Sequence, residues 1–269
     1  MVWTVNDSVA DLFDRVAARY DEPVPFFATL GCQMVAWSGS PLDGSVLDVG
    51  AGRGAVSIAV LAELSDRGGS VTAIDVSPAM VEQLEALLLD HLRAVVMDVE
   101  HLDLPADGFD HVFGGFVFHI LADVDRALHE LGRVLRPGGS ASFSVPGPNV
   151  PDDGWHLRYG DIYERFRMRI DGEAPAGMSD HGGSWEERAE RAGLILECEE
   201  DLVTEVEVGG PAAYWDWLMS HGNRWMYDAL PEPDAEEFHQ AVLASFETHP
   251  TRGRSIIAGP RFIKMRKPG

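Results

Sequence analysis

The stretch VLDVGAGRG, residues 46–54, indicates how this chain folds. Its apolar residues predict a short buried strand, and glycines at positions 50, 52 and 54 predict a tight turn into a helix that begins near residue 55. Glycine can adopt a positive φ and lets a bound molecule approach the backbone, while a helix N-terminus offers free N–H groups. Taken alone, the spacing fits either a ligand-binding loop or a turn without a ligand, because the dinucleotide fingerprint places its third glycine one residue later.

The bulk composition favours one α/β domain with insertions. The chain has 269 residues, of which 45% are hydrophobic, which is ample for a large core. It has no run of eighteen apolar residues, and its first residues carry acids rather than a basic region, so we expect a cytoplasmic protein without a membrane span. The formal net charge of −23 would repel nucleic acid and anionic membranes, so we expect a small-molecule substrate.

The two cysteines, Cys32 and Cys198, lie far apart and lack the spacing of metal ligands. This argues against a disulfide framework and against a structural zinc site. We expect two buried thiols and no bound metal.

Strands and helices alternate after the glycine loop. Further strands are predicted at 70–75, 92–98, 109–116, 140–147, 194–208 and 255–267. Strands separated by helices form a parallel sheet with helices on both faces, and such sheets bind ligands beyond the carboxyl ends of their strands. Two segments of different composition interrupt the alternation of strands and helices. The segment 148–183 is rich in Pro and Gly, and the segment 209–250 is rich in Trp.

We therefore expect a single domain over 1–269 that consists of a core and a cap. The core comprises 41–147, 184–208 and 251–269. The helical cap or lid comprises 1–40, 148–183 and 209–250.

Three aspartates occur in or at the end of predicted strands: Asp48, Asp75 and Asp98. Asp75 follows the glycine loop by about twenty residues, where an acidic side chain accepts hydrogen bonds from the ribose hydroxyls of a bound nucleoside. Asp98 has an apolar neighbour on each side, which suits an adenine ring and its exocyclic amine. The glycine loop together with Asp75 and Asp98 is a more specific indication of a nucleoside-binding site than the glycine loop alone.

The sequence resembles the class I S-adenosylmethionine-dependent methyltransferases, in the small-molecule branch that includes enzymes of ubiquinone and menaquinone biosynthesis. The resemblance covers about 46–147 and rests on VLDVGAGRG, AIDVSPAMVE, VMDVEHLDLPADGFDHVFGGFVFHIL and LRPGG, in this order. It implies a doubly wound, seven-stranded, mainly parallel Rossmann-like sheet whose last strand, about 255–266, is antiparallel. It also implies S-adenosyl-L-methionine as cofactor and no metal.

By resemblance, the glycines shape the loop against the methionine part of the cofactor, Asp75 binds the ribose, and Met80 and Met97 flank the adenine. Residues 13–21 resemble a lid helix, although Phe13 and Tyr20 also fit ordinary helix packing. The implied cofactor-binding residues are Tyr20, Asp48, Gly50, Ala51, Gly52, Gly54, Asp75, Val76, Met80, Met97, Asp98, Val99, Gly114 and Phe116.

The chemistry expected is methyl transfer to a small apolar or aromatic metabolite, with oxygen favoured over carbon or nitrogen as acceptor. His119 is the candidate general base, although a histidine there could also only shape the pocket. His181 and His221, one in each insertion, are alternatives. A chain of this fold could instead be a cofactor-binding sensor, or catalyse a reaction such as cyclisation. The oligomeric state, monomer or homodimer, stays open.

The second insertion carries an aromatic cluster, YWDWLMSHGNRWMY, at 214–227. Helical spacing would place several of these rings on one face, where they could line an acceptor pocket. Packing of a cap helix onto the sheet domain explains the same stripe.

Overall fold

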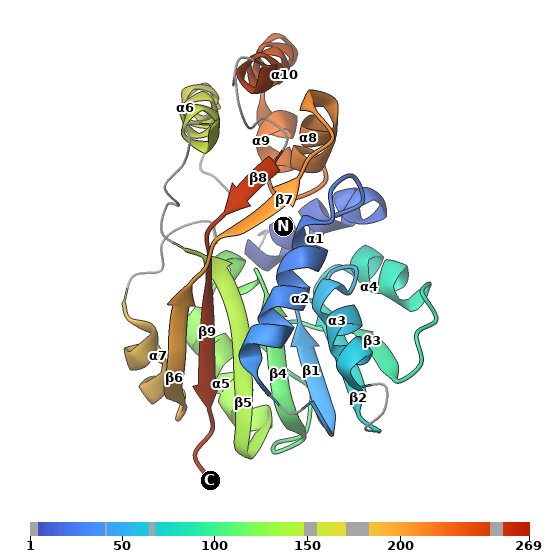
Figure 1. The fold of residues 1–269 in the computed structure, drawn as a ribbon, viewed down its shortest axis with the longest axis vertical. Coiled ribbons are helices and arrows are strands. Elements are labelled where there is room, and N and C mark those ends of the chain that lie inside the picture. Colours follow the sequence, from blue (N-terminus) through green and yellow to red (C-terminus); the bar gives the residue numbers. More distant parts are fainter. Residues whose placement is uncertain (1–4, 41, 65–67, 148–154, 171–182, 248–254) are drawn as a thin grey trace.

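The computed structural model describes residues 5–40, 42–64, 68–147, 155–170, 183–247 and 255–269, and its main element is a seven-stranded sheet (Figure 1). The strands, in spatial order, are β3 (Leu92–Val96), β2 (Ser70–Asp75), β1 (Ser45–Val49), β4 (Phe109–Gly115), β5 (Leu135–Pro146), β9 (Pro260–Arg266) and β6 (Ile195–Asp201). Strands β1 to β5 pair in parallel, and β9 pairs antiparallel with both β5 and β6. The predicted mainly parallel sheet with an antiparallel last strand is confirmed.

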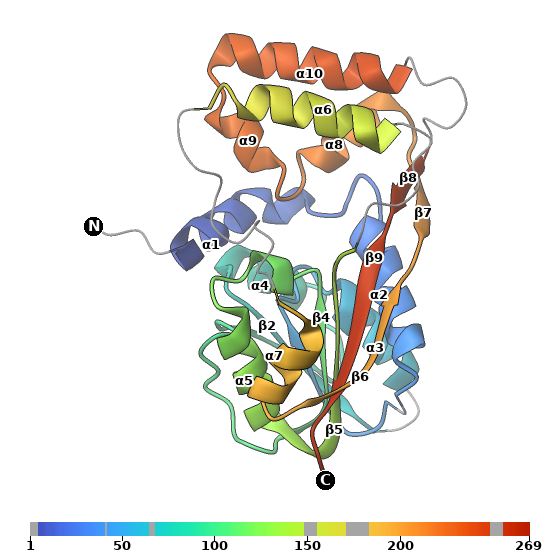
Figure 2. The same ribbon diagram turned by 90° about the vertical axis from the view of Figure 1, so that its left-hand side faces the viewer.

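Helices cover both faces of the sheet (Figure 2). Helices α2 (Phe26–Ser38) and α3 (Ala55–Leu64) pack together on one face, and α5 (Val124–Val134) and α7 (Trp185–Arg191) pack together on the other. Helix α4 (Pro78–Glu85) is capped by Ser77, whose side chain accepts a hydrogen bond from the amide of Met80. This arrangement leaves the carboxyl ends of the parallel strands free for a site.

A helical cap lies beyond that edge of the sheet. It contains α6 (Trp155–Arg167), α8 (Pro211–Leu218), α9 (Arg224–Ala229) and α10 (Glu232–Glu247), and a two-stranded ribbon of β7 (Thr204–Glu207) and β8 (Ser255–Ala258). Helix α1 (Val5–Val16) and the short helix η1 (Ala17–Arg19) lie between the cap and the sheet domain (Figures 1 and 2).

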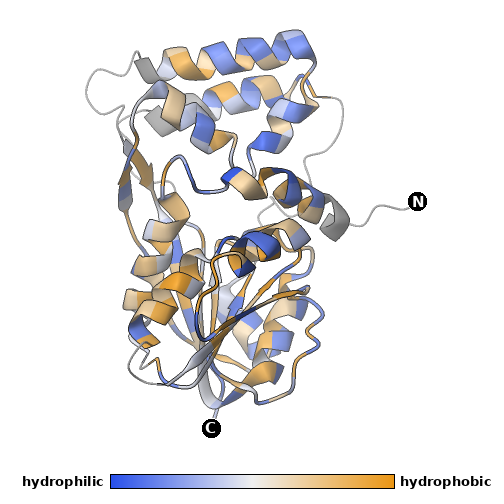
Figure 3. Cartoon of the chain, turned by 90° about the vertical axis from the view of Figure 1, so that its right-hand side faces the viewer, coloured by the Kyte–Doolittle hydropathy of each residue, from blue (hydrophilic) through white to orange (hydrophobic). Residues whose placement is uncertain are grey.

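The cap has a hydrophobic core of its own. Trp217, Trp225 and Phe238 are buried in a cluster that also takes in Leu12 of α1 and Phe26 of α2. Apolar and polar residues are mixed along α10, the uppermost helix in Figure 3. Strand β1 is buried from Val46 to Val49. The aromatic cluster therefore packs the cap onto the helices beneath it.

Several predicted elements differ from the structure. The strands expected at 194–208 and 255–267 each divide in two, because the chain leaves the sheet to form the ribbon near the pair Gly259-Pro260. The aromatic segment spans two helices with a break between them. Cys32 and Cys198 are exposed rather than buried. Within the described ranges, no helix is long and apolar enough to cross a membrane.

Candidate active site

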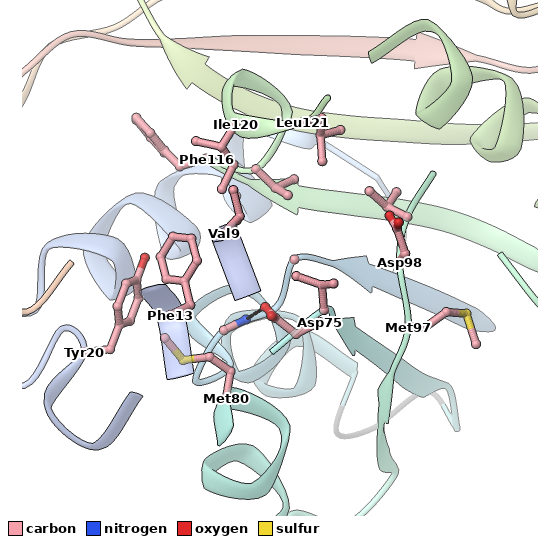
Figure 4. Close-up of a pocket in the computed structure, with 16 residues that line it drawn as sticks. Val9, Phe13, Tyr20, Asp75, Met80, Met97, Asp98, Phe116, Ile120 and Leu121 are labelled. Carbon is pink, nitrogen blue, oxygen red and sulfur yellow. Dashed lines mark hydrogen bonds between the residues drawn. The ribbon is translucent and has the colours of Figure 1, made fainter. Parts of the chain in front are cut away.

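A cavity of about 690 Å³ opens at the carboxyl ends of β1, β2 and β4. Figure 4 shows Phe13 and Tyr20 at one end of this cavity, Asp98 at the other, and Asp75 between them. The lining residues are Val9, Phe13, Tyr20, Gly50, Gly52, Asp75, Val76, Met80, Met97, Asp98, Val99, Gly115, Phe116, Val117, Ile120 and Leu121. The N-terminal segment, β1 to β4 and the chain after β4 thus meet at one site.

The glycine loop forms the floor of the cavity. Gly50 has φ +63° and Gly52 has φ +53°, in the left-handed region that glycine adopts without strain. A Cβ at Gly50 would lie 2.5 Å from the side chain of Val117, whereas one at Gly52 would extend into the gap that separates the loop from Tyr20, 3.8 Å away. The loop is therefore a bare backbone surface on which a ligand can rest.

Asp75 ends β2 at the centre of the cavity. Its carboxylate accepts hydrogen bonds from the amides of Gly52 (2.8 Å) and Ser77 (2.9 Å), which fix its orientation. Burial raises the pKa of Asp75 above its ordinary value, although these two amides oppose the shift. Each carboxylate oxygen has a further lone pair, so the group can also accept hydrogen bonds from a ligand hydroxyl.

The far end of the cavity consists of Asp98 and its neighbours. One carboxylate oxygen of Asp98 accepts from the amide of Glu100 (2.9 Å), and the other lies 3.4 Å from Nδ1 of His101. The side chain of Met97 extends away from Asp75, and Met80 is buried against the lid helix (Figure 4). An apolar slot with one carboxylate suits a heteroaromatic ring that carries an amine.

The N-terminal segment closes the cavity from above. Asp14 of α1 accepts hydrogen bonds from the Ser77 hydroxyl and from the amide of Ala79 at 3.1 Å. Arg53 of the glycine loop donates to the carbonyl oxygen of Tyr20 at 3.0 Å. Burial, together with the charges of Asp21 and Asp75, raises the pKa of the Tyr20 hydroxyl well above its ordinary value, so it remains a donor.

Ten of the fourteen cofactor-site candidates line this cavity, and four do not. The Asp48 carboxyl is buried beneath the loop, where the Ser57 hydroxyl donates to it at 2.6 Å. Ala51 lines a neighbouring cavity. Gly54 faces helix α4, because an added Cβ would lie 2.6 Å from the Leu84 side chain.

The fourth, Gly114, faces the core instead, and its neighbour Gly115 lines the cavity. An added Cβ at Gly114 would lie 2.9 Å from the ring of Phe118. Successive strand residues point to opposite faces, so Gly115 rather than Gly114 borders the cavity, and contact of Gly114 with a cofactor stays a prediction. Val117, Ile120 and Leu121 also line the cavity, and they could not be found from the sequence because they follow β4 and carry no polar signal.

The three candidate histidines differ in position. The ring of His119, on the short helix η2 (Phe118–Ile120), packs edge-on against Phe116 with centroids 5.9 Å apart and lines neither cavity. His221 is buried against Trp217 and Phe27, and burial lowers its pKa to about 4, so it stays neutral. His181 lies outside the described residues.

A second cavity, of about 670 Å³, adjoins the first on the side of α2 and α3. Apolar side chains of Phe27, Leu30, Met34 and Val56 line much of it, and Ser144 and Arg53 contribute polar atoms. Within the described part of the chain, no group of three His, Cys, Asp or Glu side chains could hold a metal ion.

Comparisons with known proteins agree with this geometry. A family model described as a methyltransferase domain matches residues 47–143. The ubiquinone/menaquinone biosynthesis C-methyltransferase of Hahella chejuensis is 30% identical over 210 residues, which are 65% of this chain and 82% of that protein. The nocamycin O-methyltransferase of Saccharothrix syringae is 28% identical over 265 residues, which are 92% of this chain and 93% of that protein. The chain belongs to the class I S-adenosylmethionine-dependent methyltransferases.

The solved structures show the same fold. The YcgJ protein of Bacillus subtilis aligns with a TM-score of 0.57 over 91% of this chain and 99% of that chain, at 17% identity. Among other curated relatives the overlap is shorter: the chain spans 28%, 64% and 54% of the length of three of them.

Proposed function

We propose that this chain transfers a methyl group from S-adenosylmethionine to a small apolar or aromatic molecule, with an oxygen atom favoured as acceptor. One observation carries the proposal: the glycine loop, Asp75 and Asp98 line a single cavity at the carboxyl ends of the strands. The relative from Saccharothrix syringae, matched over 92% of this chain and 93% of its own length, is named as an O-methyltransferase, which supports the choice of oxygen.

The residues of the first cavity fit this cofactor. A Cβ added at Gly52 would point toward Tyr20, so the bare backbone there leaves room for the methionine part of the cofactor. Asp75 is fixed by two backbone amides and can accept from both ribose hydroxyls. Asp98 and the amide of Val99 border the apolar slot where an adenine ring would lie.

Bound S-adenosylmethionine would supply an electrophilic methyl group on a positively charged sulfur. The chain's own contribution is then to align the acceptor with that methyl group and to exclude water. Phe13 and Tyr20 cover the cavity, and the hydrogen bonds of Asp14 and Arg53 hold the segment that carries them. The carboxyl groups of Asp75 and Asp98, which line the cavity, also favour a positively charged cofactor.

For a hydroxyl acceptor we propose His119 as the general base. His119 follows Phe116 by three residues and packs against its ring. The residue Phe116 lines both the first and the second cavity. Because His119 lines neither cavity, proton transfer to it needs one bridging water or a displacement of Phe116.

The direct test is incubation of the protein with S-adenosylmethionine labelled in its methyl group and a panel of phenols, amines and carboxylic acids. We expect label in an extractable product with phenols. Label in no product, together with tight binding of the cofactor, would contradict methyl transfer and favour a sensor or a cyclising enzyme.

A further inference from the structure

The two cavities adjoin each other along the glycine loop. Five residues line both of them: Tyr20, Gly50, Gly52, Gly115 and Phe116. Three of these residues are glycines, so bare backbone forms much of the boundary. A ligand that lies in the first cavity can therefore extend along this backbone into the second.

Two side chains of opposite charge line the second cavity but not the first, those of Asp21 and Arg53. Asp21 lies between η1 and α2, and Arg53 belongs to the glycine loop. The charge of Arg53 lowers the pKa of Asp21, so the two side chains are close enough to interact. Apolar side chains, among them Leu30, Met34 and Val56, line much of the remaining wall.

The carboxylate of Asp21 is held in place by the first turn of α2. It accepts hydrogen bonds from the amides of Phe27 (2.9 Å) and Ala28 (2.8 Å). Burial raises the pKa of Asp21 to about 6, although the amides of α2 and the charge of Arg53 oppose the shift. Each carboxylate oxygen has a further lone pair, so a cationic donor in the cavity would stabilise the charged form.

The guanidinium of Arg53 is held by the segment above the glycine loop. Its Nη1 atom donates to the carbonyl oxygen of Tyr20 at 3.0 Å and lies 3.4 Å from that of Ala18. A guanidinium has several further N–H donors in one plane, and this plane matches the two oxygens of a carboxylate.

The two charges make the second cavity unsuitable for a wholly apolar ligand. Such a ligand would displace water from Asp21 and Arg53 without offering either of them a counter-charge, which is costly. An α-amino acid carries an ammonium group and a carboxylate on one carbon, so it offers both counter-charges at once. The methionine part of S-adenosylmethionine is such a group, and its aliphatic stem suits the apolar part of the wall.

We infer that the second cavity holds the amino-acid end of the cofactor, with the carboxylate of Asp21 binding its ammonium group and the guanidinium of Arg53 binding its carboxylate. This assignment rests on the proposed function, which supplies the cofactor. It adds two residues to the cofactor site, one from the segment that follows the lid and one from the glycine loop.

The test is calorimetric binding of four ligands that all contain the adenosine part. They are S-adenosylhomocysteine, its decarboxylated form, its deaminated form, and 5′-methylthioadenosine, which lacks both charged groups. The variants are Asp21→Asn and Arg53→Gln. Asparagine keeps an oxygen for the amides of α2 and tolerates the φ of +56° at position 21. Thermal melting identifies any variant that does not fold.

We expect Asp21→Asn to bind S-adenosylhomocysteine and its decarboxylated form about tenfold more weakly, because both carry the ammonium group. The variant should bind the other two ligands at least as well as the native protein does. Arg53→Gln should bind S-adenosylhomocysteine and its deaminated form about tenfold more weakly, because both carry the carboxylate, and should not weaken the other two.

Two controls separate these effects from changes in net charge and in the nucleoside site. Glu22→Gln and Arg93→Gln change exposed side chains of the same charges and should bind all four ligands as the native protein does. Asp75→Ala should weaken all four ligands alike, because all four contain the ribose.

An equal loss for all four ligands in Asp21→Asn or Arg53→Gln would overturn the assignment, because it would show that the residue only supports the fold of the site. Equal affinity of the native protein for S-adenosylhomocysteine and 5′-methylthioadenosine would also overturn it. Failure of the native protein to bind any of the four ligands would instead overturn the proposed function.

Discussion

The carboxylate of Asp14 on α1 accepts a hydrogen bond from the amide of Ala79, 3.1 Å away in the first turn of α4. The same carboxylate accepts from the hydroxyl of Ser77, the residue that caps α4. One side chain therefore ties the segment above the cavity to the helix that follows Asp75.

Asp14→Ala should loosen this closure. It removes the acceptor for two donors, and a hydrogen bond of this kind contributes about 0.5–1.5 kcal/mol, so we expect S-adenosylhomocysteine to bind about 3- to 10-fold more weakly. Calorimetry measures the effect. Asp11→Ala, an exposed aspartate on the same helix, is the control, and an equal loss in both variants would assign the effect to net charge rather than to the contact.

Asp48→Asn should stabilise the protein at alkaline pH. Burial raises the pKa of Asp48 to about 7 despite the hydrogen bond from Ser57, and one of its oxygens has no partner among the described residues. The pKa of Asp48 is higher in the folded state than in the unfolded chain. The native protein therefore has the full contribution of the protonated Asp48 carboxyl to its stability below pH ~4, and loses that contribution as the pH rises through about 7.

Denaturant unfolding at pH 8 should therefore show Asp48→Asn to be more stable by about 1–3 kcal/mol, and the difference should disappear near pH 4. A difference that does not change with pH would show that the carboxyl does not titrate in this range. Asp43→Asn, which changes an exposed aspartate, is the control.

His119→Ala distinguishes an oxygen acceptor from the alternatives. If His119 accepts the acceptor's proton, the variant should lower kcat about 10²- to 10⁴-fold with a smaller change in KM. His119→Phe keeps a flat ring against Phe116, so it separates loss of the base from loss of the packing contact. Activity of His119→Phe close to that of the native enzyme would exclude the base role.

The sequence predicted the features that depend on local chemistry. The glycine loop, the acid that ends β2 and the succession of β1 to β5 along the chain follow from residues close together in the sequence, and the structure has the predicted mainly parallel sheet. The pair Ser77-Pro78 marks the start of α4, because Ser77 caps the helix and proline suits its first turn. No glycine signals the end of that helix at Glu85, and Leu88 and His91 adopt positive φ beyond it instead.

The second cavity could not be predicted, because it arises from contacts between distant segments. Helices α2 and α3 approach closely at Gly31, where an added Cβ would lie 2.8 Å from the carbonyl oxygen of Ala55. The link from Asp14 to Ala79 spans 65 positions, so no local pattern shows that the two residues meet. The choice between Gly114 and Gly115 depends on the phase of β4, which a run of two glycines does not reveal.

The central claim is that Asp75 and the glycine loop bind S-adenosylmethionine, and calorimetry with S-adenosylhomocysteine tests it most directly. Asp75→Ala removes the acceptor for the ribose and leaves the amides of Gly52 and Ser77 without their partner, so we expect binding weaker by about 1–3 kcal/mol, or roughly 5- to 150-fold. Asp90→Ala, an exposed aspartate, should bind as the native protein does. Unchanged affinity in a folded Asp75→Ala variant, or binding of NAD but not of S-adenosylhomocysteine by the native protein, would contradict the account.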